Sequence, residues 1–242
     1  MKPYYQDDLV TIYHGDALDV LVATEELVGG VMTSPPYNLG DMSGGYANLD
    51  GGYASYTDQM PHAEYVAWQR ALLSQCWRLL RDDGAIFYNH KPRIRDGLLW
   101  TPLDLNPGLP LRQIIIWARG GGMNWSETHL VPAHEWVMLF AKPRFRFSKT
   151  TSNVGDVWSV QQTGGAERMG HPAPFPLGLA RRAVDLIAEA NDGAILDPFA
   201  GSGTTLLAAK EAGRRAIGIE IEERYCEIAA TRCSQEVLGL VG

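Results

Sequence analysis

The chain has 242 residues, of which 45% are hydrophobic and 20% are charged, a composition that excludes a largely disordered chain. No apolar run approaches the roughly 20 residues that a membrane-spanning helix needs. The beginning of the chain has no apolar signal region either. We therefore expect a single cytoplasmic domain over residues 1–242 that does not bind a membrane.

Charge is unevenly distributed along the chain. The net charge of −7 by itself disfavours a polyanionic partner. Residues 1–69 hold one basic and ten acidic residues, whereas residues 70–149 hold twelve basic and six acidic residues. The middle third can therefore still face nucleic acid.

Short apolar runs alternate with helical patterns along the chain. In chain order, the runs predict buried strands at 11–13, 30–33, 85–88, 113–117, 136–140, 194–196 and 216–219. Apolar periodicity predicts helices over 62–81, 176–190, 203–212 and 222–237. This alternation predicts an α/β fold with a largely parallel sheet.

Two long stretches fit neither pattern. Residues 38–60 are rich in Gly, Tyr, Asn and Asp and predict a mobile loop, while residues 143–175 mix basic, Gly, Ser/Thr and Pro residues. Loops of this length in a compact domain are usually functional.

The first candidate site follows the predicted strand at 30–33. It consists of Ser34, Pro35, Pro36 and Tyr37. Two prolines end a strand and fix the backbone, which leaves a carbonyl and the serine hydroxyl as outward acceptors beside a flat tyrosine ring. This set suits a planar heterocycle that carries an exocyclic amine, although a plain proline turn would look the same in isolation.

The second candidate site follows the predicted strand at 194–196. A turn containing Gly201 and Gly203 leads into a helix, and Glu220 ends the next strand. Glycines let a ligand approach the backbone, and an acid at that position can accept hydrogen bonds from a ribose diol. The turn is not GxGxxG and has no lysine for phosphates, so the pattern indicates a nucleoside rather than a P-loop ligand.

Cysteine and histidine patterns exclude several chemistries. Cys76, Cys226 and Cys233 form no CxxC pair, which suits a reduced compartment, and the six histidines show no metal-ligand spacing. We therefore expect no metal site. Cys226 and Cys233 lie on a predicted helix and are expected to face the core.

Together these motifs resemble the amino-methyltransferases of DNA, in the permuted class whose catalytic motif precedes the S-adenosylmethionine motif. The segment from Ser34 to Tyr37 matches the catalytic (D/N/S)PP(Y/F) motif, and DPFAGSGTT at 197–205 matches the cofactor motif. HPAPFP at 171–176 and HGD at 14–16 match two further segments. The resemblance covers almost the whole chain.

The resemblance implies a Rossmann-like, S-adenosylmethionine-dependent fold. It has a mostly parallel seven-stranded sheet with an antiparallel last strand and helices on both faces. Both motifs then lie at the carboxyl edge of the sheet. It assigns cofactor contacts to Asp16, His171, Pro172, Phe175, Asp197, Pro198, Phe199, Gly201, Ser202, Gly203, Thr204, Thr205 and Glu220.

The resemblance also implies the reaction. Ser34 and the Pro35 carbonyl would accept hydrogen bonds from the target amine, and Tyr37 would stack on a base flipped out of double-stranded DNA. We expect phosphate contacts from the basic residues Lys142, Arg144, Arg146 and Lys149, with a second basic group at Lys91 and Arg93. A small target-recognition insert is expected at about 143–170.

Several alternatives remain open from the sequence. Methylation of a protein glutamine or an RNA base amine poses the same chemical problem, and a degenerate binding module would bind without turnover. Cytosine C5 methylation is disfavoured, because no cysteine follows a proline as that chemistry's nucleophile does in its family. The motifs do not decide between cytosine N4 and adenine N6. A homodimer and a cognate restriction endonuclease are the protein partners that this interpretation allows.

Overall fold

A computed structural model describes residues 1–38, 59–95, 97–120, 126–150, 153–161 and 176–235. Three of the predicted cofactor residues, His171, Pro172 and Phe175, lie outside the described residues. So do most of the predicted loop at 38–60 and parts of the predicted insert at 143–170.

The described residues form a mixed central sheet in the order β1-β2-β11-β10-β3-β4-β8-β7-β9. Five neighbouring strands, from β2 to β4 in that order, are parallel, and β8 runs antiparallel to both of its neighbours. The strands are β1 (Tyr5–Gln6), β2 (Val10–His14), β3 (Val28–Thr33), β4 (Leu80–His90), β7 (Leu111–Ala118), β8 (His134–Ala141), β9 (Val157–Ser159), β10 (Ile195–Asp197) and β11 (Ala216–Glu220).

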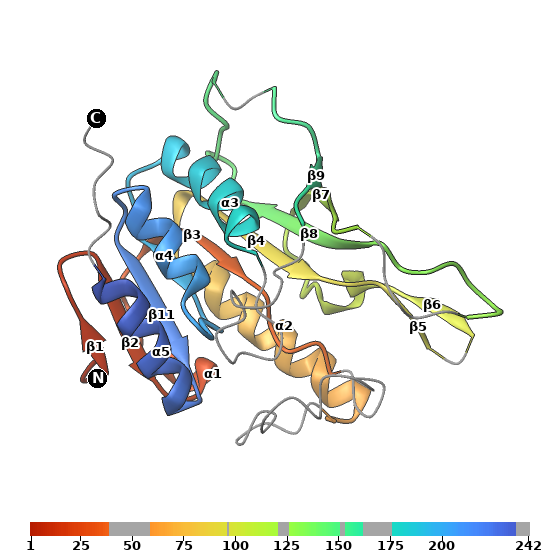
Figure 1. Ribbon diagram of the computed structural model, residues 1–242, viewed down its shortest axis with the longest axis horizontal. Coiled ribbons are helices and arrows are strands. Elements are labelled where there is room, and N and C mark those ends of the chain that lie inside the picture. Colours follow the sequence, from red (N-terminus) through yellow and green to blue (C-terminus); the bar gives the residue numbers. More distant parts are fainter. Residues whose placement is uncertain (39–58, 96, 121–125, 151–152, 162–175, 236–242) are drawn as a thin grey trace.

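Helices cover the sheet on both faces (Figure 1). One apolar layer holds α3 (Leu177–Ala190), α4 (Thr204–Glu211) and α5 (Glu223–Ser234). The other holds α1 (Ala17–Ala23) and α2 (His62–Leu79). Buried strand residues alternate between the two layers, as Val31 and Met32 do on β3, so the sheet is sandwiched as predicted.

The sheet differs from the prediction in its strand count. All seven predicted strands are present, but the described sheet has nine, because short edge strands β1 and β9 extend it. A hairpin of β5 (Arg93–Arg95) and β6 (Leu98–Trp100), a 3-10 turn (Pro102–Leu105) and helix α1 were also not predicted. These elements have two to seven residues, too few to show a periodic pattern.

The three cysteines are buried and unpaired, as expected. Burial raises the pKa of the Cys76 and Cys226 thiols to about 12, and that of Cys233 to about 11. None of them therefore offers a thiolate nucleophile at neutral pH. In the described part of the chain, no helix combines the length and apolarity needed to cross a membrane, and no cluster of His, Cys, Asp or Glu could hold a metal ion.

Candidate active site

The functional motifs meet at the carboxyl edge of the parallel strands. The catalytic motif follows β3, the glycine turn follows β10, Glu220 ends β11 and Asp16 lies just beyond β2. Because β8 runs in the opposite direction, its first residues lie at the same edge, next to the end of β4. Ligands of α/β sheets bind at this edge.

Ser34 and Tyr37 belong to a polar network that the sequence did not predict. The hydroxyl of Tyr37 lies 2.9 Å from Ser34 Oγ and donates to Glu135 Oε2, also at 2.9 Å. Asn89 Nδ2 lies 3.2 Å from Ser34 Oγ, 2.6 Å from the Tyr37 hydroxyl and 3.0 Å from Glu135 Oε2. Arg119 Nη1 pairs with Glu135 Oε1 at 2.9 Å.

The partners of Ser34 and Tyr37 in this network are buried. Asn89 is completely buried and Glu135 is 5% exposed. Burial and the neighbouring Glu135 carboxylate raise the pKa of the Tyr37 hydroxyl well above its ordinary value, so it remains a donor. A signal existed in the sequence: Asn89 and Glu135 directly flank the predicted strands 85–88 and 136–140.

The tyrosine ring is fixed by its neighbours. Its centroid lies 4.4 Å from that of His90, and Lys91 Nζ lies 5.8 Å from it. Tyr65 donates to the Pro36 carbonyl at 2.9 Å, whereas the Pro35 carbonyl accepts no hydrogen bond from another residue of the described structure. Burial lowers the pKa of His90 to about 3, which keeps this ring neutral.

Arg93 does not play its predicted role. It is 9% exposed, and its Nη1 donates to the carbonyls of Tyr37 (2.6 Å) and Asn38 (3.0 Å). Its guanidinium carbon lies 4.6 Å from the centre of the Trp100 ring. The prediction of a DNA phosphate contact is therefore wrong for Arg93, which instead holds the end of the catalytic motif.

Asn38, the residue after the motif, is hydrogen-bonded to Met60. It has a φ of 54° and exchanges two hydrogen bonds with Met60: its Nδ2 donates to the Met60 carbonyl (2.7 Å), and its Oδ1 accepts from the Met60 amide (2.6 Å). Asparagine tolerates this left-handed backbone better than most residues. The pair ties the end of the motif to the start of α2.

Asp197 is completely buried and fully engaged. It accepts from Thr33 Oγ1 (2.7 Å), from the Phe199 amide (3.0 Å) and from Thr205 Oγ1 (2.6 Å). Burial raises its pKa to about 6, although these three bonds favour the ionised form. Asp197 and Thr205 were predicted as cofactor contacts, but neither side chain has exposed surface. They therefore lie beneath the surface of the site and support it.

The turn after β10 fits a nucleoside. Gly201 and Gly203 have φ values of 51° and 80°, and the Glu220 carboxylate accepts from the amides of Gly201 (2.8 Å) and Glu222 (2.9 Å). Each carboxylate oxygen keeps lone-pair capacity for a ribose hydroxyl. Phe199 is part-exposed beside Trp68, with ring centroids 5.6 Å apart, and supplies an apolar wall. The donor and acceptor set therefore fits the adenosyl end of S-adenosylmethionine.

The remaining predicted cofactor residues are Ser202, Thr204, Pro198 and Asp16, and each has a defined place in the structure. Arg232 on α5 donates to the carbonyl and hydroxyl of Ser202 and lies 3.5 Å from Thr204 Oγ1. Pro198 is buried within the turn. Asp16 caps α1 by accepting from the Leu18 amide at 2.8 Å, and its contact with the cofactor stays a prediction.

The main basic stretch lies at the opposite edge of the sheet. The Lys142 amide donates to the Gly84 carbonyl and the Arg144 amide to the Asp82 carbonyl, near the start of β4. Gly84 and His90 are six residues apart along this strand, roughly 20 Å at about 3.3 Å per residue. The phosphate contacts of Lys142, Arg144, Arg146 and Lys149 stay a prediction, and they require DNA that extends from the catalytic edge to this end of the sheet.

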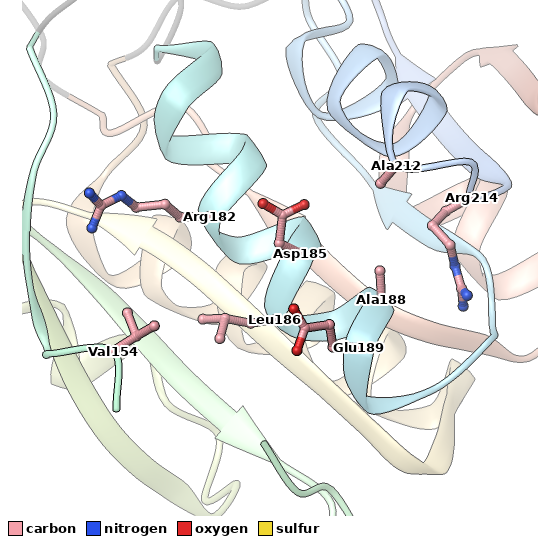
Figure 2. Close-up of a pocket in the computed structure, with 8 residues that line it drawn as sticks. All are labelled: Val154, Arg182, Asp185, Leu186, Ala188, Glu189, Ala212 and Arg214. Atoms are coloured by element: carbon pink, nitrogen blue, oxygen red, sulfur yellow. The ribbon is translucent and has the colours of Figure 1, made fainter. Parts of the chain in front are cut away.

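A cavity of about 650 Å³ lies on the outer side of α3, also away from the catalytic motif. Figure 2 shows Arg182, Asp185 and Glu189 projecting from this helix, with Val154 and Arg214 on opposite sides. Glu189 accepts from Ser148 and Thr150, which ties the segment after β8 to the end of α3. The first part of the predicted recognition insert is thus built into the body of the domain.

The family model and the curated relatives that match this chain all describe DNA methyltransferases. The model of the DNA methylase family with N6 and N4 specificity matches residues 28–231. The type II methyltransferase M.ScaI of Streptomyces caespitosus is 29% identical, and the match covers 99% of this chain and 86% of that protein. M.BglII of Bacillus subtilis is also 29% identical, over 90% of this chain and 67% of that protein.

Solved structures share the fold. The PvuII DNA methyltransferase, described as cytosine-N4-specific, superposes with a TM-score of 0.76 at 22% identity, covering 98% of this chain and 91% of that chain. A Thermus thermophilus protein described as a DNA modification methylase was solved with S-adenosyl-L-methionine; its TM-score is 0.66 at 26% identity, covering 94% and 96% of the two chains. The chain therefore belongs to the N6/N4 DNA methylase family and uses S-adenosylmethionine.

Proposed function

We propose that this protein methylates the exocyclic amine of a base flipped out of double-stranded DNA, at cytosine N4 or adenine N6. The observation that carries the proposal is the hydrogen bond between Thr33 and Asp197. It joins the residue before the catalytic motif to the first residue of the cofactor turn. The amine-binding and cofactor-binding segments therefore adjoin.

The chain's residues have separable roles in this proposal. Glu220, the glycine turn and Phe199 hold the cofactor, which supplies a methyl group activated by a sulfonium. Ser34 Oγ and the Pro35 carbonyl accept from the target amine, which turns its lone pair toward the methyl group. Holding both reactants in this geometry supplies much of the acceleration.

Tyr37 and Lys91 complete the base site. The Tyr37 ring is held from behind by His90 and is partly exposed, so it can stack on the flipped base. Lys91 is a predicted DNA-contacting residue whose Nζ lies 5.8 Å from the centre of the Tyr37 ring, where a phosphate of the target strand could approach. The family match favours DNA over a protein glutamine or an RNA amine.

Nucleoside mass spectrometry tests the proposal. DNA from a methylation-deficient host expressing the protein is compared with DNA from hosts carrying an empty vector or the Ser34→Ala variant. We expect N4-methylcytosine or N6-methyladenine in the first sample only, which also identifies the base. A folded protein that binds S-adenosylmethionine yet leaves DNA unmodified would overturn the proposal.

The names of the relatives also suggest a biological setting. Several are type II methyltransferases, so we propose that the protein protects DNA against a cognate restriction endonuclease. Challenge of the modified DNA with restriction enzymes of known specificity tests this directly. Sedimentation of the free protein tests whether it is a homodimer.

A further inference from the structure

The hydrogen bonds around Tyr37 have a defined direction. Glu135 is an acceptor only, since its carboxylate is paired with Arg119, so the single Tyr37 hydroxyl proton points to Glu135 Oε2. The Ser34 hydroxyl must then be the donor in its 2.9 Å contact with the Tyr37 oxygen. This leaves an Oγ lone pair on Ser34 to accept from outside the network.

We propose that Glu135 is the terminal proton acceptor of the methyl transfer and acts through Tyr37 and Ser34. This inference rests on the proposed function. The proton from the target amine passes to Ser34 Oγ while the Ser34 proton passes to the Tyr37 oxygen and the Tyr37 proton passes to Glu135. Each oxygen in the chain lies 2.9 Å from the next.

The step balances without an added reactant. One amine N–H bond breaks as the N–C bond to the methyl group forms, and one O–H bond forms on Glu135. The two hydroxyls each gain and lose one proton. The sulfonium takes the electron pair of the broken S–C bond and leaves as a neutral thioether, so the lost positive charge ends as the proton on Glu135.

Two features of the site support this direction of transfer. A ring amine that is gaining a methyl group becomes acidic and has to lose a proton, and a carboxylate lies at the end of the chain of hydroxyls that starts at Ser34. Asn89 Nδ2 lies within 3.2 Å of all three oxygens of the chain and keeps them aligned. The ion pair between Arg119 and the other carboxylate oxygen, Oε1, fixes the orientation of Glu135 and leaves Oε2 toward Tyr37.

The test compares Tyr37→Phe, Glu135→Gln and the double variant with the wild-type protein. Phenylalanine keeps the ring on His90 and removes only the hydroxyl; glutamine keeps the shape of Glu135 without its charge. The probe is genomic DNA of the methylation-deficient host with radiolabelled S-adenosylmethionine, followed in single-turnover experiments. We expect each single variant to be about 100-fold slower, within the range that positioned proton transfer contributes.

A structural role and a relay differ in two measurable ways. In a relay, the double variant is no slower than the slower single variant, because both changes break the same chain. The affinity for S-adenosylmethionine and the KM for DNA stay within about threefold of wild type. Glu189→Gln is the matched control: it makes the same exchange at a carboxylate that accepts from Thr150 at 2.7 Å on the opposite edge, and its rate stays at the wild-type value.

Three outcomes would overturn the inference: a wild-type rate in Tyr37→Phe, a wild-type rate in Glu135→Gln, or losses that multiply in the double variant. If Glu135→Gln fails to fold, Tyr37→Phe alone decides, because it leaves the Glu135–Arg119 pair intact. Failure of the proposed function looks different, since the wild-type protein would then methylate no DNA at all.

Discussion

The hydroxyl of Thr33 donates to Oδ1 of Asp197 at 2.7 Å and joins the last residue of β3 to the last residue of β10. Thr205 holds the other carboxylate oxygen from the start of α4. One buried acid thus fixes the catalytic motif, the cofactor turn and the helix behind them in a single arrangement. The ionisation of this acid has a consequence for stability.

Raising the pH from 4 to 7 should destabilise the wild-type protein relative to Asp197→Asn. The pKa of Asp197 is about 6 in the folded protein against 3.8 for the ordinary group, so the folded state binds the proton more tightly. The stabilisation of the folded state that comes from this tighter proton binding is fully present below pH 3.8 and is lost as the pH rises through 6. This pKa difference corresponds to a change of roughly 3 kcal/mol in the free energy of unfolding.

Urea unfolding of both proteins at several pH values measures this difference. Asparagine keeps an acceptor for Thr33 and carries no ionisable group, so its free energy of unfolding serves as the reference. A difference between the two proteins that does not change with pH would show that Asp197 ionises as an ordinary carboxyl group.

Tyr37→Ala should reduce methylation by at least about 100-fold, because it removes both the stacking surface and the hydroxyl at the centre of the polar network. The affinity for S-adenosylmethionine should stay near the wild-type value, since the Glu220 carboxylate is held by the amides of its own segment and of the glycine turn. Single-turnover kinetics and calorimetric titration of the cofactor check the two parts. Full activity in the variant would exclude the assigned role.

Gly203→Ala should weaken both stability and cofactor binding. Gly203 has a φ of 80°, and a Cβ atom there would lie 2.9 Å from the Ala229 Cβ on α5. Because this distance is too short, Ala229 would have to move away. Gly213→Ala is the matched control, with a φ of 65° and nothing within 4 Å of the added atom. We expect about 1–2 kcal/mol for the backbone alone at Gly213 and roughly 1–3 kcal/mol more at Gly203.

Thermal unfolding of the two glycine variants separates backbone strain from overpacking. Cofactor titration adds a second measurement, because the turn at 201–203 lies at the site and Gly213 follows α4 at its far end. Equal losses of stability in both variants would mean that α5 can shift away from the added methyl group with no loss of free energy of unfolding.

Lys91→Glu should weaken DNA binding by about tenfold or more at about 0.1 M salt and should flatten the salt dependence. Arg144→Glu makes the same charge reversal at an exposed position on the opposite edge, and its affinity should stay within about twofold of wild type. Fluorescence anisotropy with a duplex at two salt concentrations tests both. A large loss in Arg144→Glu alone would place the DNA on the other edge of the sheet.

The sequence contained most of the fold. Each of the seven predicted strands is found within a few residues of its predicted place, because a strand covered on both faces must be apolar throughout. The helix α1 was missed, since its seven residues span less than two periods of an apolar stripe. The predicted helix at 62–81 ends at Leu79, where β4 begins directly.

The site was harder to predict from the sequence than the fold, because apolar patterns do not reveal which side chains contact each other. Tyr37 and Glu135 are 98 positions apart and meet only because β8 lies antiparallel beside β4. Because of the same strand direction, the basic stretch that begins at Lys142 lies near the start of β4, at the edge opposite the catalytic motif. Arg93 was misjudged because a charge pattern does not show which guanidinium turns inward onto backbone carbonyls.

The reversed direction of β8 has an evolutionary consequence. Since β7 ends and β8 begins at the catalytic edge, the described residues that connect them, 119–120 and 126–133, lie next to that edge and belong to neither apolar layer. Leu130, 92% exposed, already lies on it. Apart from Arg119, which pairs with Glu135, the described residues of this connection can be exchanged without repacking a helix or strand, so this part of the chain is free to vary while the polar network stays intact.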